Sequence, residues 1–385
     1  MKNNINCPVR NIIWVENIFP VRFRVPSGTP HEKLSPYYVP DGTLFIGKYC
    51  FSTYIISLTG LVVLAYLFLS IFTGCNIINK DISSVEPIHI NRFDKDLFQL
   101  IAIDTPELQE KTLTDYPAML KVIGLSIFGT QNTQNADFFD RMLNYYSEPT
   151  LKHLYSDAIQ KFSTIETIEA SLGKGFHNLK TQFPTMQIPA VYIHVSGLKE
   201  NVLVDDSLLS ISIDKYMGAD YPLYQDFFYA YQLRKMNPDY IVPDYLRAWL
   251  IAEFPFKGND RILLERMIYE GKINYILHRT LPKVMPEILI GYHSSDYQWC
   301  KKNEKFVWNL IIERKHLFTP DAATTKRYFS DMPSVFIADD APGNLGSWIG
   351  WQIVNQYMKK AKVSLEELMK NTDYQEILRI SRYKP

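Results

Sequence analysis

The sequence predicts an α+β protein in which helices dominate and pack around a small antiparallel sheet at about residues 188–214. Three observations support this prediction. Short apolar-alternating runs cluster in that one region, capped helical patterns lie on both sides of it, and aromatic residues make up 14% of the chain, which is typical of a well-filled core. Strands set between helical runs, without regular alternation of the two, favour the α+β class.

Four segments are expected along the chain. Residues 1–48 form an anomalous N-terminal extension, because their short aromatic clusters are broken by prolines and glycines. Residues 49–75 form a hydrophobic segment, residues 76–87 a polar tether, and residues 88–385 a single globular domain. The 41 basic and 41 acidic residues balance, so no strong electric field is expected to attract nucleic acid.

The hydrophobic segment has two interpretations. Residues 51–72 carry no charge and are long enough to cross ~30 Å of hydrocarbon as a helix, which favours an uncleaved anchor. The basic Lys48 before the segment and the small pair Thr73-Gly74 before Cys75 favour a cleaved bacterial lipoprotein signal, with Cys75 as the lipid attachment residue. In both cases the chain after residue 75 is exported, since the positive charge lies on the N-terminal side.

The first part of the globular domain reads as a strand followed by helices. Residues 88–93 alternate as a short strand does. Thr105 is a helix cap and Pro106 occupies the first helical position, where its missing N–H costs little. Further helices are predicted at 136–146 and 148–162.

The sheet is predicted from three consecutive runs. Residues 190–195 and 201–204 are apolar and bounded by turn signals, and residues 207–213 alternate with one apolar face. A turn at Asp205-Asp206 joins the last two runs. Consecutive runs joined by short turns predict antiparallel pairing.

The second half is predicted to be helical. Pro243-Asp244 opens one helix, Asn259-Asp260 caps another, and a third spans about 296–314. Ser364 and Glu367 form a capping box for a final short helix. In PGNLGSWIG (342–350), the backbone N–H groups at the start of the predicted helix could bind an anion. The favoured interpretation is that Gly346 and Gly350, one helical turn apart, let another element approach closely.

Few patterns point to catalysis. No two of the eight histidines have the i,i+4 spacing of a zinc helix, and neither a G-x-S-x-G elbow nor a phosphate loop is present. Cys300, beside Trp299, is interpreted as a packing residue. The sequence therefore predicts no cofactor and no metal.

Several segments, taken in order, resemble the gliding-motility lipoprotein GldB family from about residue 75 to 385. They are NRFDKDLF (91–98), IPAVYIHVSG (188–197), SIDKYMG (212–218) with Tyr221 and Tyr224, MIYEGKINY (267–275), PGNLGSWIGWQIVNQYM (342–358) and SRYKP (381–385). The resemblance implies an envelope lipoprotein needed for gliding over surfaces, in a system tied to type IX secretion. It also favours cleavage and lipidation at Cys75 over an anchor.

A more distant resemblance concerns a group of predicted zinc peptidases with H-E-x-x-H on one helix and a further ligand on the next. The matching stretch here is residues 252–256, AEFPF, in which Glu253 stands at the glutamate position. Ala252 and Phe256 occupy both histidine positions, and Pro255 is expected to end the helix. Glu270 falls at the position of the third ligand. Two carboxylates without imidazoles do not make this kind of zinc site.

The sequence thus predicts a non-enzymatic lipoprotein that acts through contacts with other envelope proteins of gliding or secretion, its exported domain facing the periplasm. Which membrane holds the lipid is left open. The alternatives are a divergent hydrolase using Glu253 or Glu270, and a module that binds peptide or glycan in the vestigial cleft. For both glutamates, ordinary ion pairs with nearby arginines and lysines are the expected structural role.

Overall fold

A four-stranded sheet in the order β1-β2-β4-β3 lies at the centre of the computed structural model, which describes residues 85–130, 132–133 and 136–385. The strands are β1 (Ile90–Asn91), β2 (Ala190–His194), β3 (Val202–Asp205) and β4 (Leu208–Ser212). Every residue of β4 is buried, as expected for a strand covered on both faces. Helices dominate the rest, which confirms the predicted α+β class.

The sheet is mixed, and the prediction of an antiparallel sheet was wrong for two of its three pairings. β1 and β4 both run parallel to β2, and the β3–β4 hairpin alone is antiparallel. The reason lies in the connection after β2. The chain passes to the outer edge to form β3, and the hairpin then returns β4 into the place beside β2, in the same direction as β2. The residue 88–93 run joins the sheet as β1.

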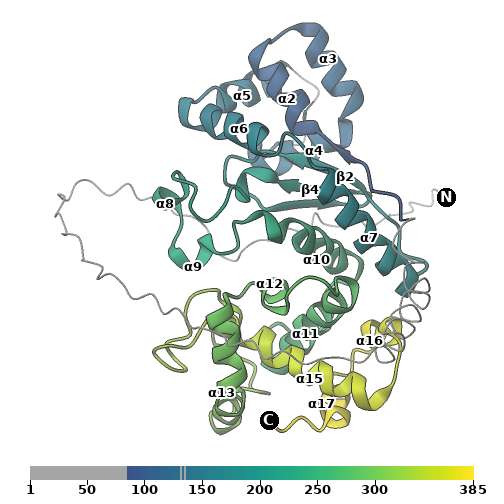
Figure 1. Cartoon of the computed structure of the whole chain (residues 1–385), viewed down its shortest axis with the longest axis vertical. Helices are drawn as coiled ribbons and strands as arrows, with labels where there is room; N and C mark the ends of the chain where they lie inside the picture. The colour runs from purple at the N-terminus through teal and green to yellow at the C-terminus, as the bar shows by residue number, and fades with distance from the viewer. Residues whose placement is uncertain (1–84, 131, 134–135) are drawn as a thin grey trace, which may run out of the picture. The chain divides into compact units, whose positions relative to one another are not determined.

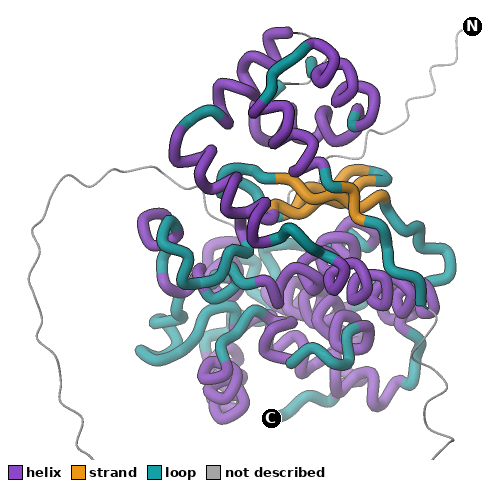
Figure 2. Tube along the Cα trace, turned by 45° about the horizontal axis from the view of Figure 1, so that its top comes forward, coloured by secondary structure: helices purple, strands orange, loops and turns teal. Residues whose placement is uncertain are grey.

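Helices cover both faces of the sheet, as Figure 1 shows, and Figure 2 shows the strands as a layer between them. On one face lie α2 (Phe93–Ala102), α3 (Pro106–Asp115), α4 (Pro117–Phe128), α5 (Ala136–Tyr146) and α6 (Pro149–Lys161). Thr105 caps α3, and its side chain accepts a hydrogen bond from Leu108 N, as predicted. On the other face lie α7 (Glu166–Gln182) and α10 (Ile241–Glu253).

Short elements connect the sheet to α10: η1 (Ile213–Lys215), α8 (Tyr224–Phe227), α9 (Ala230–Leu233) and η2 (Pro238–Tyr240). The α10 helix is tied to the sheet by Tyr245, whose hydroxyl donates to the carbonyl of Tyr192 in β2 at 2.5 Å. Trp249, one turn further along, donates its indole N–H to the carbonyl of Gln187. The position of α10 is therefore determined by the strand layer.

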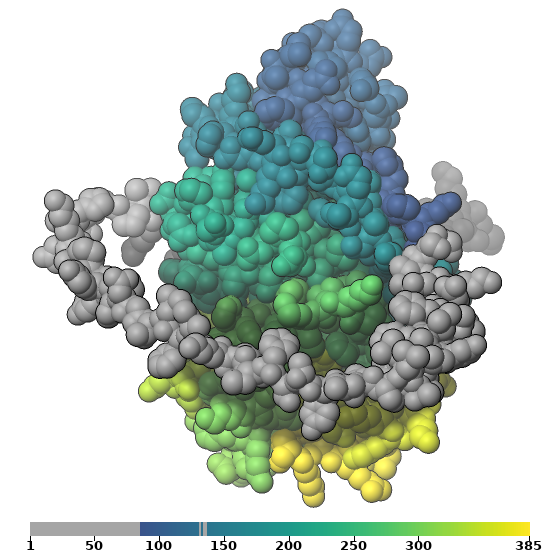
Figure 3. Space-filling view, in the orientation of Figure 1, coloured from purple at the N-terminus to yellow at the C-terminus, as the bar shows by residue number. Residues whose placement is uncertain are grey.

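Beyond α10 follow α11 (Leu263–Thr280), α12 (Pro286–Ile290), α13 (Ser294–Glu313), α14 (Ala322–Phe329), α15 (Leu345–Ala361), α16 (Leu365–Lys370) and α17 (Tyr374–Ser381). Figure 3 shows the N-terminal helices at one end of the described unit and the C-terminal ones at the other. The capping box of Ser364 and Glu367 is present. Helix α11 begins later than predicted, because the Asn259 side chain accepts from Arg261 N in a separate turn before it.

Helices α11 and α15 cross at glycine residues, where the backbones of the two helices are in contact. A Cβ atom at Gly271 would lie well inside contact distance of the Gly350 carbonyl, and one at Gly350 would overlap the Met267 carbonyl. Gly346 faces the ring of Phe329 instead, at 2.6 Å from the position of a Cβ. Close approach of another element at Gly346 and Gly350, the favoured prediction, is confirmed.

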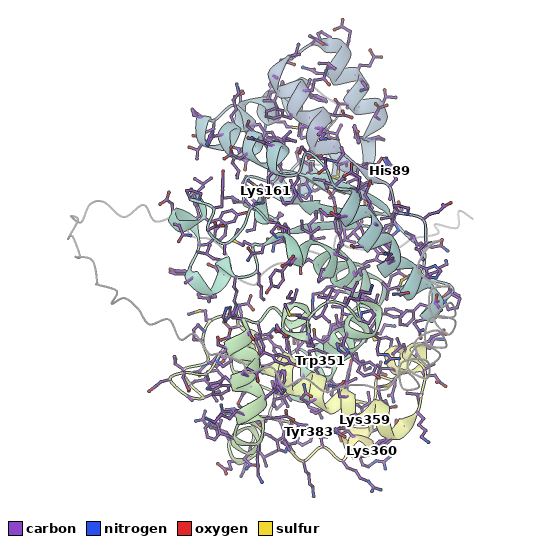
Figure 4. The ribbon with its side chains drawn as sticks, viewed as in Figure 1. His89, Lys161, Trp351, Lys359, Lys360 and Tyr383 are labelled. Atoms are coloured by element: carbon purple, nitrogen blue, oxygen red, sulfur yellow. The ribbon has the colours of Figure 1, made fainter. Side chains whose placement is uncertain are left out.

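The C-terminal segment is held against α13 and α15. Tyr383 donates its hydroxyl to Glu304 at 2.8 Å, and Lys360 donates to the carbonyl of Ser381 at 2.5 Å. Figure 4 shows Lys360 and Tyr383 close together at this end of α15. Lys272 of α11 donates to the carbonyl of Asn371, also at 2.5 Å. Among the residues described, no helix has the length and apolar character needed to span a membrane.

Candidate functional site

The lipid attachment residue predicted from the sequence, Cys75, lies outside the described residues, as does the whole 49–75 segment. The two glutamates predicted from the vestigial peptidase motif are both described. They come from the adjacent helices α10 and α11, and this helix pair is the candidate site.

Glu253 is the last residue of α10. Phe254 caps the helix, its N–H bonded to the carbonyl of Leu250, and Pro255 follows outside it. The prediction that Pro255 ends the helix is confirmed. Glu253 is half-buried, and within the described chain it makes no ion pair. Ordinary ion pairing, which was expected of both glutamates, is therefore wrong for Glu253.

Glu270 has the ion pairs that were predicted. Its carboxylate lies 3.0 Å from Arg266, one turn earlier in α11, and 3.5 Å from Arg247 of α10. The Glu270 side chain is 13% exposed, so the three charges interact in a partly desolvated setting. One negative charge between two positive charges leaves the cluster with a net charge of +1.

Among the described residues no contact joins the two glutamates, although Tyr269, next to Glu270, donates its hydroxyl to the carbonyl of Phe254, next to Glu253, at 3.0 Å. Arg247 faces Glu270, and Glu253 follows Arg247 by six residues, so the two side chains lie about 120° apart around the axis of α10. Ala252 lies about 140° around from Arg247 by the same geometry. The face of α10 that carries the vestigial motif therefore does not point to Glu270.

Aromatic rings occupy the end of the vestigial motif. The ring of Phe256, at the second histidine position, lies 5.1 Å from that of Tyr269 and 6.1 Å from that of Tyr374. The Arg266 guanidinium lies over Phe256 at 5.2 Å. These residues do not fit a zinc ion of the H-E-x-x-H type, because the side chains of Ala252 and Phe256 have no atom that can donate a lone pair to a metal.

Asn274 extends the polar row of α11 by one turn beyond Glu270. It is fully buried and accepts a hydrogen bond from Arg247, which also donates to the carbonyl of Leu289 at 2.8 Å. The Asn274 amide nitrogen has no partner. Trp351 of α15, labelled in Figure 4, lies beside His278 at 5.6 Å between rings, and its indole N–H is also without a partner.

A second polar cluster, which the residue patterns did not reveal, lies where β2 and β4 end. The carboxylate of Asp214 accepts hydrogen bonds from Ser212 and from the backbone N–H groups of Ser196 and Leu198. Burial raises the pKa of Asp214, against the opposing effect of these bonds. The corresponding signal in the sequence is the SIDKYMG segment (212–218), which is one of the segments that carry the family resemblance.

Lys215 lies next to Asp214 and is also buried. Its ammonium group donates to the carbonyl of Leu198 at 3.2 Å and lies 4.3 Å over the ring of Phe228. Burial lowers the pKa of Lys215 to about 8, although Asp214 opposes this. The bonds to Ser196 and Leu198 hold the loop after β2, so the cluster stabilises the carboxyl end of the parallel strands.

The histidines have structural or surface positions. His194 is fully buried in β2, where Nδ1 lies 2.8 Å from the Ser210 hydroxyl and burial lowers the pKa of the ring to about 3. His89 and His153 are largely exposed. In the described part of the chain, no three metal-binding side chains of the His, Cys, Asp or Glu type are grouped together.

The fold and the α10–α11 pair define a helix-rich α+β protein in which one glutamate of α11 pairs with arginines of both helices. A family model described as gliding motility protein GldB matches residues 75–385, and the chain belongs to this family. It is a family of lipoproteins of the cell envelope, anchored to a membrane. No curated protein and no solved structure matches the chain.

Proposed function

We propose that this protein is a non-catalytic lipoprotein, anchored through Cys75, that supports gliding motility and the associated type IX secretion by contacts with other envelope proteins. The observation that carries the non-catalytic role is the pairing of Glu270 with Arg247 and Arg266. A carboxylate whose two oxygens are each occupied by a guanidinium group is not free to bind a metal ion or to take a proton from a substrate.

The metal-free scaffold is part of the same proposal. The stretch that resembles H-E-x-x-H ends its helix at Glu253 and offers alanine and phenylalanine in place of imidazoles. The alternative function, a divergent hydrolase, draws on Glu253, which is half-buried and makes no ion pair with any described residue.

Metal and activity measurements distinguish the two. We expect the purified full-length protein to carry less than stoichiometric zinc and to show no peptidase activity that depends on Glu253. Stoichiometric zinc, together with peptidase activity that Glu253→Gln abolishes and Asp260→Asn leaves intact, would establish the hydrolase. Asp260 is the control because it is an exposed acid in the same connection.

Lipid attachment is tested at Cys75, where the family match begins. We expect the wild-type protein to become labelled in cells that are fed a palmitate analogue. The Cys75→Ser variant should carry no label and should no longer be recovered in the membrane fraction. A Cys50→Ser variant serves as control. Equal labelling of the Cys75→Ser variant would contradict lipidation at this residue.

The role in motility is tested by deletion. We expect the deletion strain to lose surface spreading and the secretion of type IX substrates, and the wild-type gene to restore both. Protease accessibility in intact and permeabilised cells tests the periplasmic orientation, and membrane fractionation identifies the membrane. A deletion strain that spreads and secretes normally would refute the proposed role.

A further inference from the structure

The described chain enters the domain along α7. The N–H of Ile90 donates to the Glu169 carboxylate at 2.9 Å, and the N–H of Ile88 donates to the Glu169 carbonyl at 3.3 Å. One turn further along α7, Gly173 leaves room for Glu86, whose carbonyl oxygen would lie 2.7 Å from a Cβ atom at this position. Followed back from Ile90 to Glu86, the chain therefore runs towards the C-terminal half of α7.

The surface beside this entry carries basic side chains. Asn178 of α7 donates its side-chain amide to the carbonyl of Thr280 at 2.9 Å, which joins the last turn of α11 to α7. Four exposed basic residues lie within four positions of one end of this hydrogen bond: Lys174, His177, Arg279 and Lys283. Because Lys174 and Asn178 are neighbours one turn apart on α7, the basic groups of the two segments share one surface.

Neighbouring acids do not neutralise these cations. Within the described residues, neither lysine of the set takes part in an ion pair, and nor does the arginine. Residues 170–182 and 271–286 contain no aspartate or glutamate, and Glu86 at the chain entry supplies one exposed negative charge. The 41 basic and 41 acidic residues balance over the whole chain, so this is a local excess of positive charge, of the kind that attracts an anionic surface.

The length of the chain before this entry limits how far the basic surface can lie from the membrane. Ten residues separate Val85 from Cys75, the proposed lipid attachment residue, and a chain of this length spans at most about 35 Å. A compact domain of about 300 residues is about 50 Å across. The side of the domain opposite the entry therefore cannot rest on the membrane, whereas the surface beside the entry can.

We propose that Lys174, His177, Arg279 and Lys283 form a membrane-docking surface, which binds the anionic headgroups of the membrane in which Cys75 is anchored. The lysine and arginine side chains contact lipid phosphates, and the short connection from Cys75 keeps the surface close to them. The side that carries α8 and α9 lies across the described unit from α7 (Figure 1), so it is turned away from the membrane and towards other envelope proteins. This orientation rests on the lipid anchor of the proposed function.

The test uses the full-length protein, purified in detergent and reconstituted into vesicles whose lipids carry a headgroup quencher. In a chain with Cys7→Ser and Cys50→Ser, a fluorophore is attached to Thr181→Cys, seven residues after Lys174 on the same face of α7, or to Ala230→Cys in α9. In vesicles of phosphatidylcholine and phosphatidylglycerol, the label at position 181 should be quenched several-fold more than the label at position 230. This difference should shrink in phosphatidylcholine alone, and at about 1 M salt, where the screening length falls to about 3 Å.

Two charge variants identify the residues that dock. The first removes the lysine and arginine charges of the surface: Lys174→Gln, Arg279→Gln and Lys283→Gln. It should lose the effect of phosphatidylglycerol, because each basic side chain at an anionic surface contributes about fivefold to docking. The second is the matched control, which removes three exposed charges from α13 and should behave as the wild type does: Lys301→Gln, Lys302→Gln and Lys305→Gln.

Equal quenching of the two labels would assign the basic surface to an acidic partner protein and overturn the proposal. An unchanged response of the first variant to phosphatidylglycerol would also overturn it. The intact mass of the same preparation reports the lipid at Cys75. A protein without its lipid anchor is therefore distinguishable from an anchored protein whose domain does not dock.

Discussion

Replacing Gly350 with alanine tests the crossing of α11 and α15. The new methyl group would overlap the carbonyl group of Met267, and a backbone atom inside a helix cannot rotate away as a side chain can. Overpacking costs about 1–3 kcal/mol, and a backbone clash belongs at the upper end of that range. Alanine gains about 1 kcal/mol in helix propensity over glycine. The expected net loss of stability is therefore about 2 kcal/mol.

Gly346→Ala is the matched control, since it lies one turn earlier in the same helix. There the methyl group meets the Phe329 ring, a half-buried side chain that can shift. We expect its stability to stay within about 1 kcal/mol of the wild type. Urea unfolding of the full-length proteins, followed by far-UV circular dichroism, measures both changes. Equal stability of Gly350→Ala and wild type, or a larger loss for Gly346→Ala, would refute the backbone contact.

Three further predictions concern charged and polar groups. A double-mutant cycle with Arg247→Gln and Glu270→Gln, measured by urea unfolding, should give a coupling free energy of about 1–2 kcal/mol. This exceeds the coupling of a typical surface ion pair because both side chains are mostly buried. A coupling free energy near zero would contradict the proposed cluster. Burial lowers the pKa of Lys272 to about 8 from 10.5, so between these pH values the unfolded chain binds more protons than the folded one, and stability should rise from pH 8 to 10.5. The Lys272→Met variant should flatten this rise and be more stable than the wild type at pH 7 by on the order of 2 kcal/mol. An unchanged pH profile of stability would exclude a buried charge at this position. Tyr383→Phe removes the hydrogen bond to Glu304 and should cost about 1–2 kcal/mol in thermal or urea unfolding, whereas no loss would show that the C-terminal segment contributes little.

Local features of the fold could be predicted from the sequence. The start of α3 follows from Thr105 and Pro106, and the start of α16 from Ser364 and Glu367, because a cap depends on residues within one turn. The pairing of Arg266 with Glu270 is also local, as these residues are four apart in one helix.

Other features depend on contacts between distant segments. The direction of β4 relative to β2 depends on which strand occupies the place between β2 and β3, and no pattern inside the strands specifies this. Arg247 reaches Glu270 from a different helix. Nothing in the residues around Arg234 distinguishes it from an ordinary surface arginine. Its pairing with Asp296 becomes apparent only when the end of α9 and the start of α13 are seen together.

The position of β1 in the sheet has a consequence for the order of folding. Ile90 pairs with Val191, so about one hundred residues of helix separate the two halves of this parallel pairing. Pairings between distant segments close late and slow folding. A chain that crosses a membrane from its N-terminus would deliver β1 well before the strand that holds it. During that interval the β1 segment is open to solvent and to chaperones, and the helices between β1 and β2 have no sheet to cover. In the proposed exported form of this protein, factors that protect a partly folded chain should therefore assist its passage across the membrane.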